Sequence, residues 1–189
     1  MNKMMQLFVM LSLGLSINAH AQSAVLMYIQ PFEYINEIKL QHYTTEHWFA
    51  QGPVVEPIAK EHLTKVLGEV SICEGKQTGK ILVWVQPRMF YNGQLQVFYG
   101  QVTANVYTGV GQLVASYVGE STQQGSLNIQ PDYWLNLAYT HAVEKMQEKM
   151  QADTHLQTIL TQPSELSGSD TPCSMVTLLP VPRVRAMSF

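Results

Sequence analysis

Residues 80–124 read KILVWVQPRMFYNGQLQVFYGQVTANVYTGVGQLVASYVGESTQQ, and this stretch decides the fold. Its first part, Lys80–Val85, is rich in β-branched and aromatic residues and predicts a strand. Pro87 follows, and because proline has no N–H to donate, it indicates a bulge or an edge at that point. Asn92-Gly93 predicts a two-residue hairpin turn, since both residue types tolerate the positive φ that such a turn requires.

The rest of the stretch completes a meander. A second strand is expected from about Gln94 to Tyr107, and residues 108–111, with two glycines, predict the next turn. A third strand then returns over Gln112–Gly119. Together these segments predict three consecutive antiparallel strands.

The flanking sequence supplies one more strand and a helix. Ala24–Ile29 is apolar and predicts a first strand, which Pro31 ends. Between Val55 and Leu67 the apolar residues recur at steps of three and four, which predicts an amphipathic helix with Glu56 at its start and Gly68 after its end. Residues 32–52 are mixed and carry no assignment.

A second helix follows the meander. It is expected from Pro131 to about Ala152, with one apolar stripe formed by Leu135, Ala138, Tyr139, Ala142, Met146 and Met150. The element order is therefore β-α-β-β-β-α. It predicts an α+β two-layer sandwich in which an antiparallel sheet carries two helices on one face.

The start of the chain predicts export. Lys3 is followed by an apolar run to about Ile17 and by Ala19-His20-Ala21, the pattern of a signal peptide over residues 1–21 with cleavage after Ala21. The apolar run is too short to span a bilayer, so no transmembrane segment is expected in the mature chain. The predicted location is the periplasm, with one α+β domain over residues 22–161 and a linker and tail over residues 162–189.

The cysteines agree with an oxidising compartment. The chain has two, Cys73 and Cys173, and export favours a disulfide between them that ties the C-terminal tail back to the domain. The bond would close a loop of about 100 residues, for which chain entropy gives at most about 4.7 kcal/mol. The alternative is two separate buried thiols.

Charge and motifs exclude several function classes. Removal of residues 1–21 changes the net charge from −3 to −4, and an acidic chain without a basic patch does not predict a nucleic-acid partner. No H-x-x-x-H or H-E-x-x-H spacing predicts a metal site, and no G-x-S-x-G elbow predicts a hydrolase. We therefore expect no cofactor, no metal and no enzymatic activity.

Three segments carry a family resemblance. Trp48-Phe49, the run from Val55 to Leu63, and Tyr133-Trp134-Leu135, set around a long hairpin, resemble the auxiliary lipoproteins of ABC-type transport systems and the YajG-like periplasmic lipoproteins. The resemblance covers about residues 24–152 and lies in the order of the elements. It implies an accessory role in envelope maintenance or lipid trafficking. The chain departs from the family pattern at Gln22, where the lipid-carrying cysteine would stand.

The candidate binding site is the helix-free sheet face. Strand alternation along the middle strand places Phe98, Val102, Ala104 and Val106 under the helices and the opposite set on the other face. That other face is expected to carry Tyr99 and Tyr107, with Trp84 and Tyr117 from the neighbouring strands. Aromatic and amide side chains are favoured at interfaces, although a plain solvated face or one covered by residues 174–189 would explain the same pattern.

These observations lead to two functional hypotheses. The first is a non-catalytic periplasmic module that docks a protein partner of the cell envelope through the sheet face or a sheet edge. The second is a carrier that holds a lipid or another apolar small molecule between sheet and helices.

Overall fold

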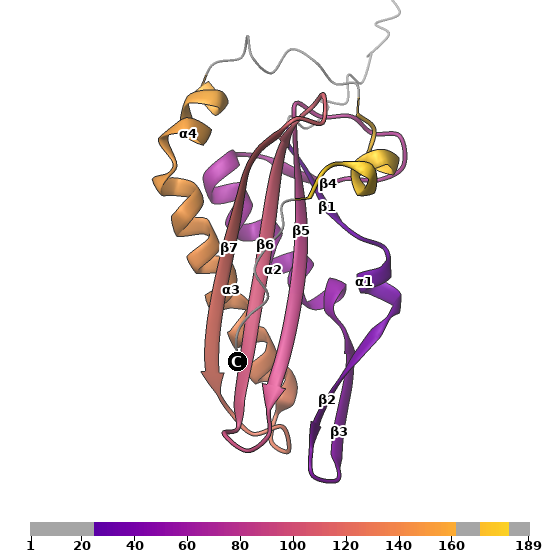
Figure 1. The fold of residues 1–189 in the computed structure, drawn as a ribbon, viewed down its shortest axis with the longest axis vertical. Coiled ribbons are helices and arrows are strands. Elements are labelled where there is room, and N and C mark those ends of the chain that lie inside the picture. The colour runs from indigo at the N-terminus through magenta and orange to yellow at the C-terminus, as the bar shows by residue number, and fades with distance from the viewer. Residues whose placement is uncertain (1–24, 162–170, 182–189) are drawn as a thin grey trace, which may run out of the picture.

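The computed structural model describes residues 25–161 and 171–181, and it has the expected α+β class (Figure 1). A five-stranded sheet with the order β4-β1-β5-β6-β7 carries helices on one face, and a separate two-stranded hairpin stands beside it. The predicted signal peptide lies outside the described residues. The elements are β1 (Val25–Ile29), α1 (Phe32–Ile35), β2 (Glu37–His42), β3 (Thr45–Ala50), α2 (Gln51–Leu67), β4 (Val70–Ile72), β5 (Ile81–Asn92), β6 (Val97–Thr108), β7 (Leu113–Gln124), α3 (Pro131–Ala152), α4 (Thr154–Thr161) and the 3-10 helix η1 (Cys173–Leu178).

The predicted meander forms the long part of the sheet. Strands β5, β6 and β7 are antiparallel neighbours, and β7 continues five residues past the expected end at Gly119. The first turn differs from the prediction, because Asn92 pairs with Val97 and the loop between them spans residues 93–96. The Asn92 side chain explains this longer loop, since its Oδ1 accepts hydrogen bonds from the N–H groups of Gln94 at 3.0 Å and Leu95 at 3.1 Å.

The sheet is mixed instead of wholly antiparallel, which corrects the sequence prediction. Strand β1 is parallel to both β4 and β5, because α2 crosses over the sheet between β1 and the strands that follow it. Val85 is the last β5 residue that pairs with β1, and Pro87 pairs with Val102 of β6 without a shift in register. Of the two expectations for Pro87, the edge is therefore the one that the structure confirms.

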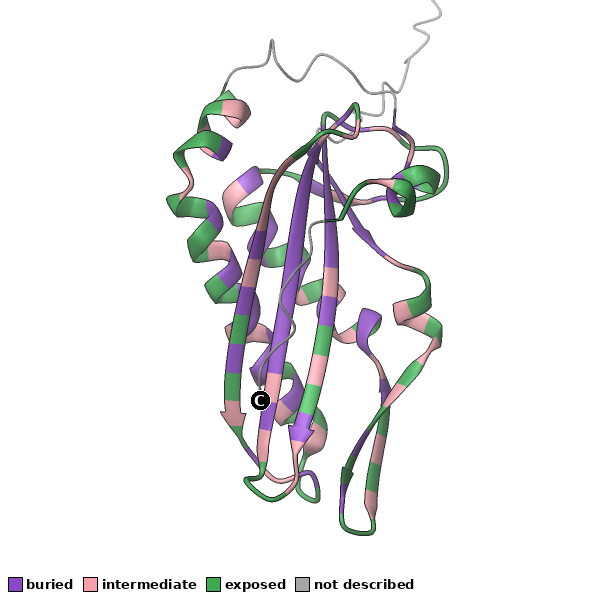
Figure 2. Cartoon of the chain, in the orientation of Figure 1, coloured by how far each residue is buried: buried purple, intermediate pink, exposed green. Residues whose placement is uncertain are grey.

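The unassigned residues 32–52 form α1 and the β2–β3 hairpin, which projects beside the sheet (Figure 1). The side chains of β2 alternate, with Leu40 and His42 buried and Lys39 and Gln41 exposed (Figure 2). One face of the hairpin therefore packs on the core, while the other faces solvent.

Both predicted helices form and pack on the same sheet face. Helix α2 ends at Leu67 and is capped by Gly68, which has a φ of 83°, and all six residues of the predicted α3 stripe are buried. Helix α3 lies very close to β7 because Gly119 has no side chain: a Cβ there would come within 1.8 Å of the Ala142 carbonyl oxygen. The space between sheet and helices is filled by side chains such as Phe98, Val102 and Met146.

The Cys73–Cys173 disulfide is present and holds η1 against the helix-free face of the sheet, with 5.4 Å between the two Cα atoms. A second apolar cluster lies beneath η1 and is separate from the main core. This second cluster contains Leu26, Tyr28, Cys73, Leu82, Trp84, Tyr107, Cys173 and Val176.

Residues 162–170 and 182–189 of the expected linker and tail lie outside the described residues.

Candidate functional site

Two of the four predicted site residues lie on the helix-free face but are covered. Trp84 and Tyr107 belong to the cluster beneath η1, with exposed fractions of 5% and 0%. The Tyr107 hydroxyl donates a hydrogen bond of 2.9 Å to the carbonyl oxygen of Pro180. The prediction that Trp84 and Tyr107 are exposed is therefore wrong. The physical reason is that a C-terminal segment covers this part of the face, which was the alternative raised from the sequence.

Tyr117 points to the opposite face. It pairs with Ala104, so its ring lies on the helix side, and its hydroxyl donates a 2.7 Å hydrogen bond to Asp153. The reason is a bulge: Tyr107 pairs with Leu113, whereas Val106 already pairs with Ala115. One extra residue in β7 moves every later side chain of that strand to the other face. Burial and the neighbouring carboxylate of Asp153 raise the pKa of Tyr117 well above its ordinary value.

Tyr99 lies on the expected face, next to exposed apolar side chains. It is half-buried and pairs with Phe90 of β5, with 5.9 Å between the ring centroids. Phe90 is 40% exposed, and Leu95 in the adjoining loop is 59% exposed. We call Phe90, Leu95 and Tyr99 the β5–β6 tip.

Between this tip and the covered part of the face, the amide side chains bond to one another. Asn105 donates to Gln86 at 3.1 Å and accepts from the Ser116 hydroxyl at 2.7 Å. Gln101 donates to Glu120 at 2.9 Å. Asn105 and Gln101 are also buried, so these amides form an internally satisfied network, not an open polar surface.

Sheet edges were the other docking element expected from the sequence. Strand β7 is the outer strand of the sheet, and Lys149 of α3 donates a 2.6 Å hydrogen bond to the Val118 carbonyl oxygen of that strand. A lysine at an edge opposes pairing with a further strand, because it brings a charge to the backbone groups that the added strand would use.

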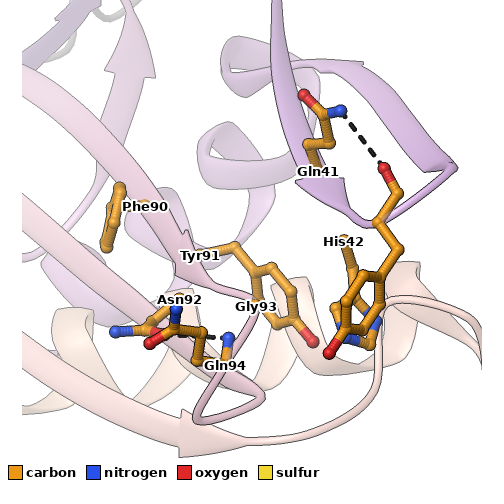
Figure 3. Close-up of a pocket in the computed structure, with 8 residues that line it drawn as sticks. Gln41, His42, Phe90, Tyr91, Asn92, Gly93 and Gln94 are labelled. Carbon is orange, nitrogen blue, oxygen red and sulfur yellow. Dashed lines mark hydrogen bonds between the residues drawn. The ribbon is translucent and has the colours of Figure 1, made fainter.

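A pocket of about 360 Å³ lies between the β2–β3 hairpin and the end of β5 (Figure 3). Two features define its chemistry. Its lining, formed by described residues, contains no Asp, Glu, Lys or Arg, and it combines aromatic rings with side-chain amides. The lining residues are Gln41, His42, Tyr43, Phe90, Tyr91, Asn92, Gly93 and Gln94.

The walls of this pocket are held close together at Gly93. A Cβ on Gly93 would lie 3.1 Å from Cδ2 of His42 and 3.3 Å from the Gln41 carbonyl oxygen, so a side chain would require these neighbours to shift by a few tenths of an ångström. The His42 ring packs against Tyr43 and Tyr91, with centroid distances of 4.5 Å and 6.2 Å. Its Nδ1 is buried and has no hydrogen-bond partner within the part of the chain that the structure describes.

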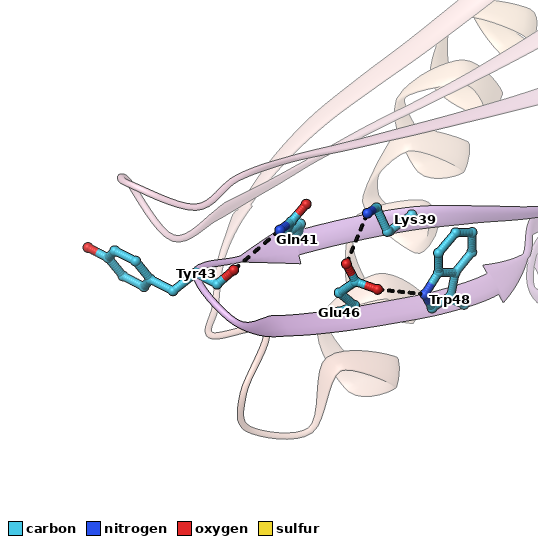
Figure 4. Close-up of polar contacts among 5 residues, drawn as sticks. All are labelled: Lys39, Gln41, Tyr43, Glu46 and Trp48. Atoms are coloured by element: carbon cyan, nitrogen blue, oxygen red, sulfur yellow. Dashed lines mark hydrogen bonds and ion pairs between the residues drawn. The ribbon is translucent and has the colours of Figure 1, made fainter.

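The outer face of the hairpin carries charged and aromatic residues (Figure 4). Lys39 lies 3.0 Å from a Glu46 carboxylate oxygen, and the Trp48 indole N–H donates to the same carboxylate at 3.3 Å. The Lys39 hydrogen bond, followed by that of Trp48, lowers the pKa of Glu46. Lys39 also lies 5.5 Å from the Trp48 ring centroid, so the outer face is a linked set of exposed side chains.

The remaining chemistry-bearing residues are dispersed. Over residues 25–161 and 171–181, no group of three His, Cys, Asp or Glu side chains could hold a metal ion. His47 lies 3.0 Å from Asp132, and His62 is bonded to Gln147. No helix in these ranges is long and apolar enough to cross a membrane.

Sequence reasoning missed the hairpin and therefore the pocket. The alternation of Glu37, Lys39 and Gln41 with Ile38, Leu40 and His42 was a strand signal within residues 32–52. Its mixed polar and apolar composition and the absence of glycine from the Tyr43-Thr44 turn concealed it.

No family model and no curated protein sequence matches the chain. The resemblance to the ABC-type transport auxiliary and YajG-like lipoproteins is therefore not supported by a family match. Several solved structures match weakly, among them two crystal structures. One, titled a "putative lipoprotein from Caulobacter crescentus CB15", is 12% identical with a TM-score of 0.33, covering 59% of this chain and 84% of its own.

The other crystal structure, titled an "uncharacterized protein", is 11% identical with a TM-score of 0.38, covering 67% of this chain and 91% of its own. These TM-scores are too low for either likeness to support an argument about function.

Proposed function

We propose that this chain is a non-catalytic module of the periplasm that docks a protein partner of the cell envelope through the β5–β6 tip. The observation that carries the proposal is the exposure of Phe90 and Leu95 beside the half-buried ring of Tyr99. Large apolar and aromatic side chains that gather at one place on a surface are favoured at protein interfaces, because they bury a large area on contact.

The position of the tip supports this role. It lies at the end of the β5–β6 hairpin that is remote from η1, so the segment that covers Trp84 does not cover it (Figure 1). The sheet beneath it is stiffened by paired strands on both sides of β6. A rigid scaffold lowers the entropy that docking costs, since few groups must be ordered on binding.

The periplasmic location rests on two features of the chain. The sequence of residues 1–21 predicts export, and the Cys73–Cys173 disulfide is of the kind that persists in oxidising compartments. The rival role as a lipid carrier has less support, because Phe98, Val102 and Met146 fill the space between sheet and helices where a carried molecule would lie.

The proposal is tested by site-specific photo-crosslinking in intact cells. A photoreactive residue at Leu95 should give one dominant adduct with an envelope protein, whereas the same residue at Glu148, exposed on α3, should not. Phe90→Ser should reduce the Leu95 adduct at least about tenfold, as expected for loss of an aromatic hot spot. Equal adduct patterns at Leu95 and Glu148, or an adduct unchanged by Phe90→Ser, would contradict docking at the tip.

A further inference from the structure

Tyr43 has an unusual conformation at the end of the β2–β3 hairpin. His42 pairs with Thr45, so the turn consists of Tyr43 and Thr44, and Tyr43 has a φ of 51°. Glycine and asparagine adopt this left-handed region readily, whereas bulky residues do so at a cost. The side chain is also 84% exposed, so core packing does not compensate the cost. Residues held in this region cluster at functional sites, although the Tyr43 ring does contact the His42 ring, with 4.5 Å between the centroids.

Tyr43 also lines the pocket between the hairpin and β5. Phe90 and Tyr91 contribute further aromatic surface from the β5 side. The amide residues Asn92 and Gln94 also line the pocket, and Gln41 borders it with its backbone, because its side chain lies on the solvent face of the hairpin. The volume of about 360 Å³ lies within the usual range for small-molecule sites.

The internal hydrogen bonds of these amides leave groups for a ligand. Gln94 carries an amide with an acceptor oxygen and an NH₂ donor, whereas the Gln41 amide donates to the Tyr43 carbonyl oxygen at 3.3 Å on the solvent face of the hairpin. Asn92 uses its Oδ1 for the loop N–H groups, which leaves its side-chain NH₂ as a donor. The pocket therefore offers both donors and acceptors next to aromatic faces, without a formal charge from acidic or basic residues.

From this combination we propose that the pocket binds a neutral saccharide, with Tyr43 as the ring on which one sugar face rests. A sugar has apolar C–H faces that pack on aromatic rings, and hydroxyl edges that bond to amides. An anionic ligand would lose hydration without meeting Lys or Arg, and a purely apolar ligand would leave the amides without partners. This site goes beyond the proposed docking role: it shares Phe90 with the β5–β6 tip, but Tyr43 is not part of the tip.

The proposal is tested by titrating the purified exported chain with N,N′-diacetylchitobiose, with maltose and with galacturonic acid, followed by NMR chemical-shift changes. One or both neutral disaccharides should bind with a Kd of about 1 mM, and galacturonic acid should not bind. Tyr43→Asn should weaken the binding at least about tenfold, while Tyr43→Phe should stay within about threefold, because it keeps the ring.

Asparagine is chosen at position 43 so that the variant still folds. Asparagine suits a φ of 51°, so Tyr43→Asn should melt at the same temperature as the wild type or higher. The Leu95 adduct in cells should be unchanged by Tyr43→Asn, so the saccharide site and the docking tip can fail separately. Absence of binding by both neutral disaccharides, preferred binding of galacturonic acid, or full binding by Tyr43→Asn would overturn the proposal.

Discussion

Tyr99 and Tyr107 lie on the same strand and the same face, yet their surroundings differ. Tyr107 is completely buried beneath the C-terminal segment and donates to Pro180, whereas Tyr99 is half-buried beside Phe90. Strand alternation correctly assigns both to the helix-free face. It could not reveal that a segment about 70 residues later covers only one of them, because strand periodicity carries no information on distant chain segments.

Replacement of these two tyrosines should have unequal effects on stability. Tyr107→Ser removes a ring from a closed cluster and should lower the free energy of unfolding by about 3–5 kcal/mol, the usual range for truncating a buried aromatic side chain. Tyr99→Ser should lower it by about 1 kcal/mol or less, because the site is open to solvent on one side. Chemical denaturation of the two single variants measures both values.

Tyr107→Phe serves as the matched control for this pair. It keeps the ring and removes only the hydrogen bond to Pro180, so it should cost about 1 kcal/mol. Similar losses for Tyr99→Ser and Tyr107→Ser would mean that η1 does not cover Tyr107 in solution.

Among the elements, the junction of α3 and α4 depends on one carboxylate. Asp153 Oδ1 accepts hydrogen bonds from the N–H groups of His155 at 2.9 Å and Leu156 at 3.2 Å, which caps the start of α4. Its other oxygen accepts from the Tyr117 hydroxyl of β7 at 2.7 Å. Asp153 therefore joins two helices and the outer strand. The Tyr117 hydrogen bond is the main reason that the pKa of Asp153 is lowered from its ordinary value of 3.8.

This lowered pKa predicts a pH dependence of stability. Because the folded state favours the charged form, the contribution of Asp153 is present above a pH of 3.8 and is lost as the pH falls through the lower pKa of the folded protein. Asp153→Ala should cost about 2 kcal/mol at pH 7, through loss of the cap and of the acceptor for Tyr117. Unfolding by urea at pH 7 and below pH 4 measures the change.

Asp153→Asn separates the charge from the cap. Asparagine caps helices as well as aspartate, so this variant should stay close to the wild type at pH 7, and its difference from the wild type should shrink as the pH falls below 3.8. A difference that grows in acid would show that another group controls the stability there.

The local sequence predicts some of the elements and not others. The α2 and α3 stripes, the end of α2 at Gly68 and the turn at residues 108–111 could be predicted, because periodicity and glycine act locally. The loop after Asn92 and the bulge before Ala115 could not, since side-chain capping and one extra residue in β7 leave no periodic signal. The bulge alone explains why Tyr117 lies on the helix side.

At the scale of the whole molecule, the Cys73–Cys173 disulfide joins the segment after β4 to the start of η1. The two cysteines are 100 residues apart in the sequence, so the disulfide closes a long loop. The cluster beneath η1 is small and separate from the main core, so its retention depends on the disulfide more than the main core does. Trp84 within it also has a buried Nε1 without a hydrogen-bond partner among the described residues, which weakens the packing.

The double variant Cys73→Ala/Cys173→Ala should lower the free energy of unfolding by about 2–4 kcal/mol, below the loop-entropy limit of about 4.7 kcal/mol. It should also expose Trp84, because η1 is no longer tied to the sheet. Acrylamide quenching measures the exposure in a background of Trp48→Phe and Trp134→Phe, which leaves Trp84 as the remaining tryptophan. Chemical reduction of the parent protein should give the same quenching. Protected Trp84 in both would show that Val176 and Tyr107 hold η1 without the disulfide.

The sequence by itself determined the α+β class, the two long helices and the three-stranded meander, and it favoured the pairing of Cys73 with Cys173 that the structure shows. The helices and strands depend on short-range periodicity and on turn residues, which can be read from neighbouring residues. The disulfide could be favoured because the chain has only two cysteines. Only the tertiary structure decided that β1 is parallel to β5, that η1 covers Trp84 and Tyr107, and that the β2–β3 hairpin meets Gly93 to form a pocket. Each of these depends on contacts between segments far apart in the sequence, whose energies are set by shape and register in three dimensions and leave no periodic trace in either segment alone.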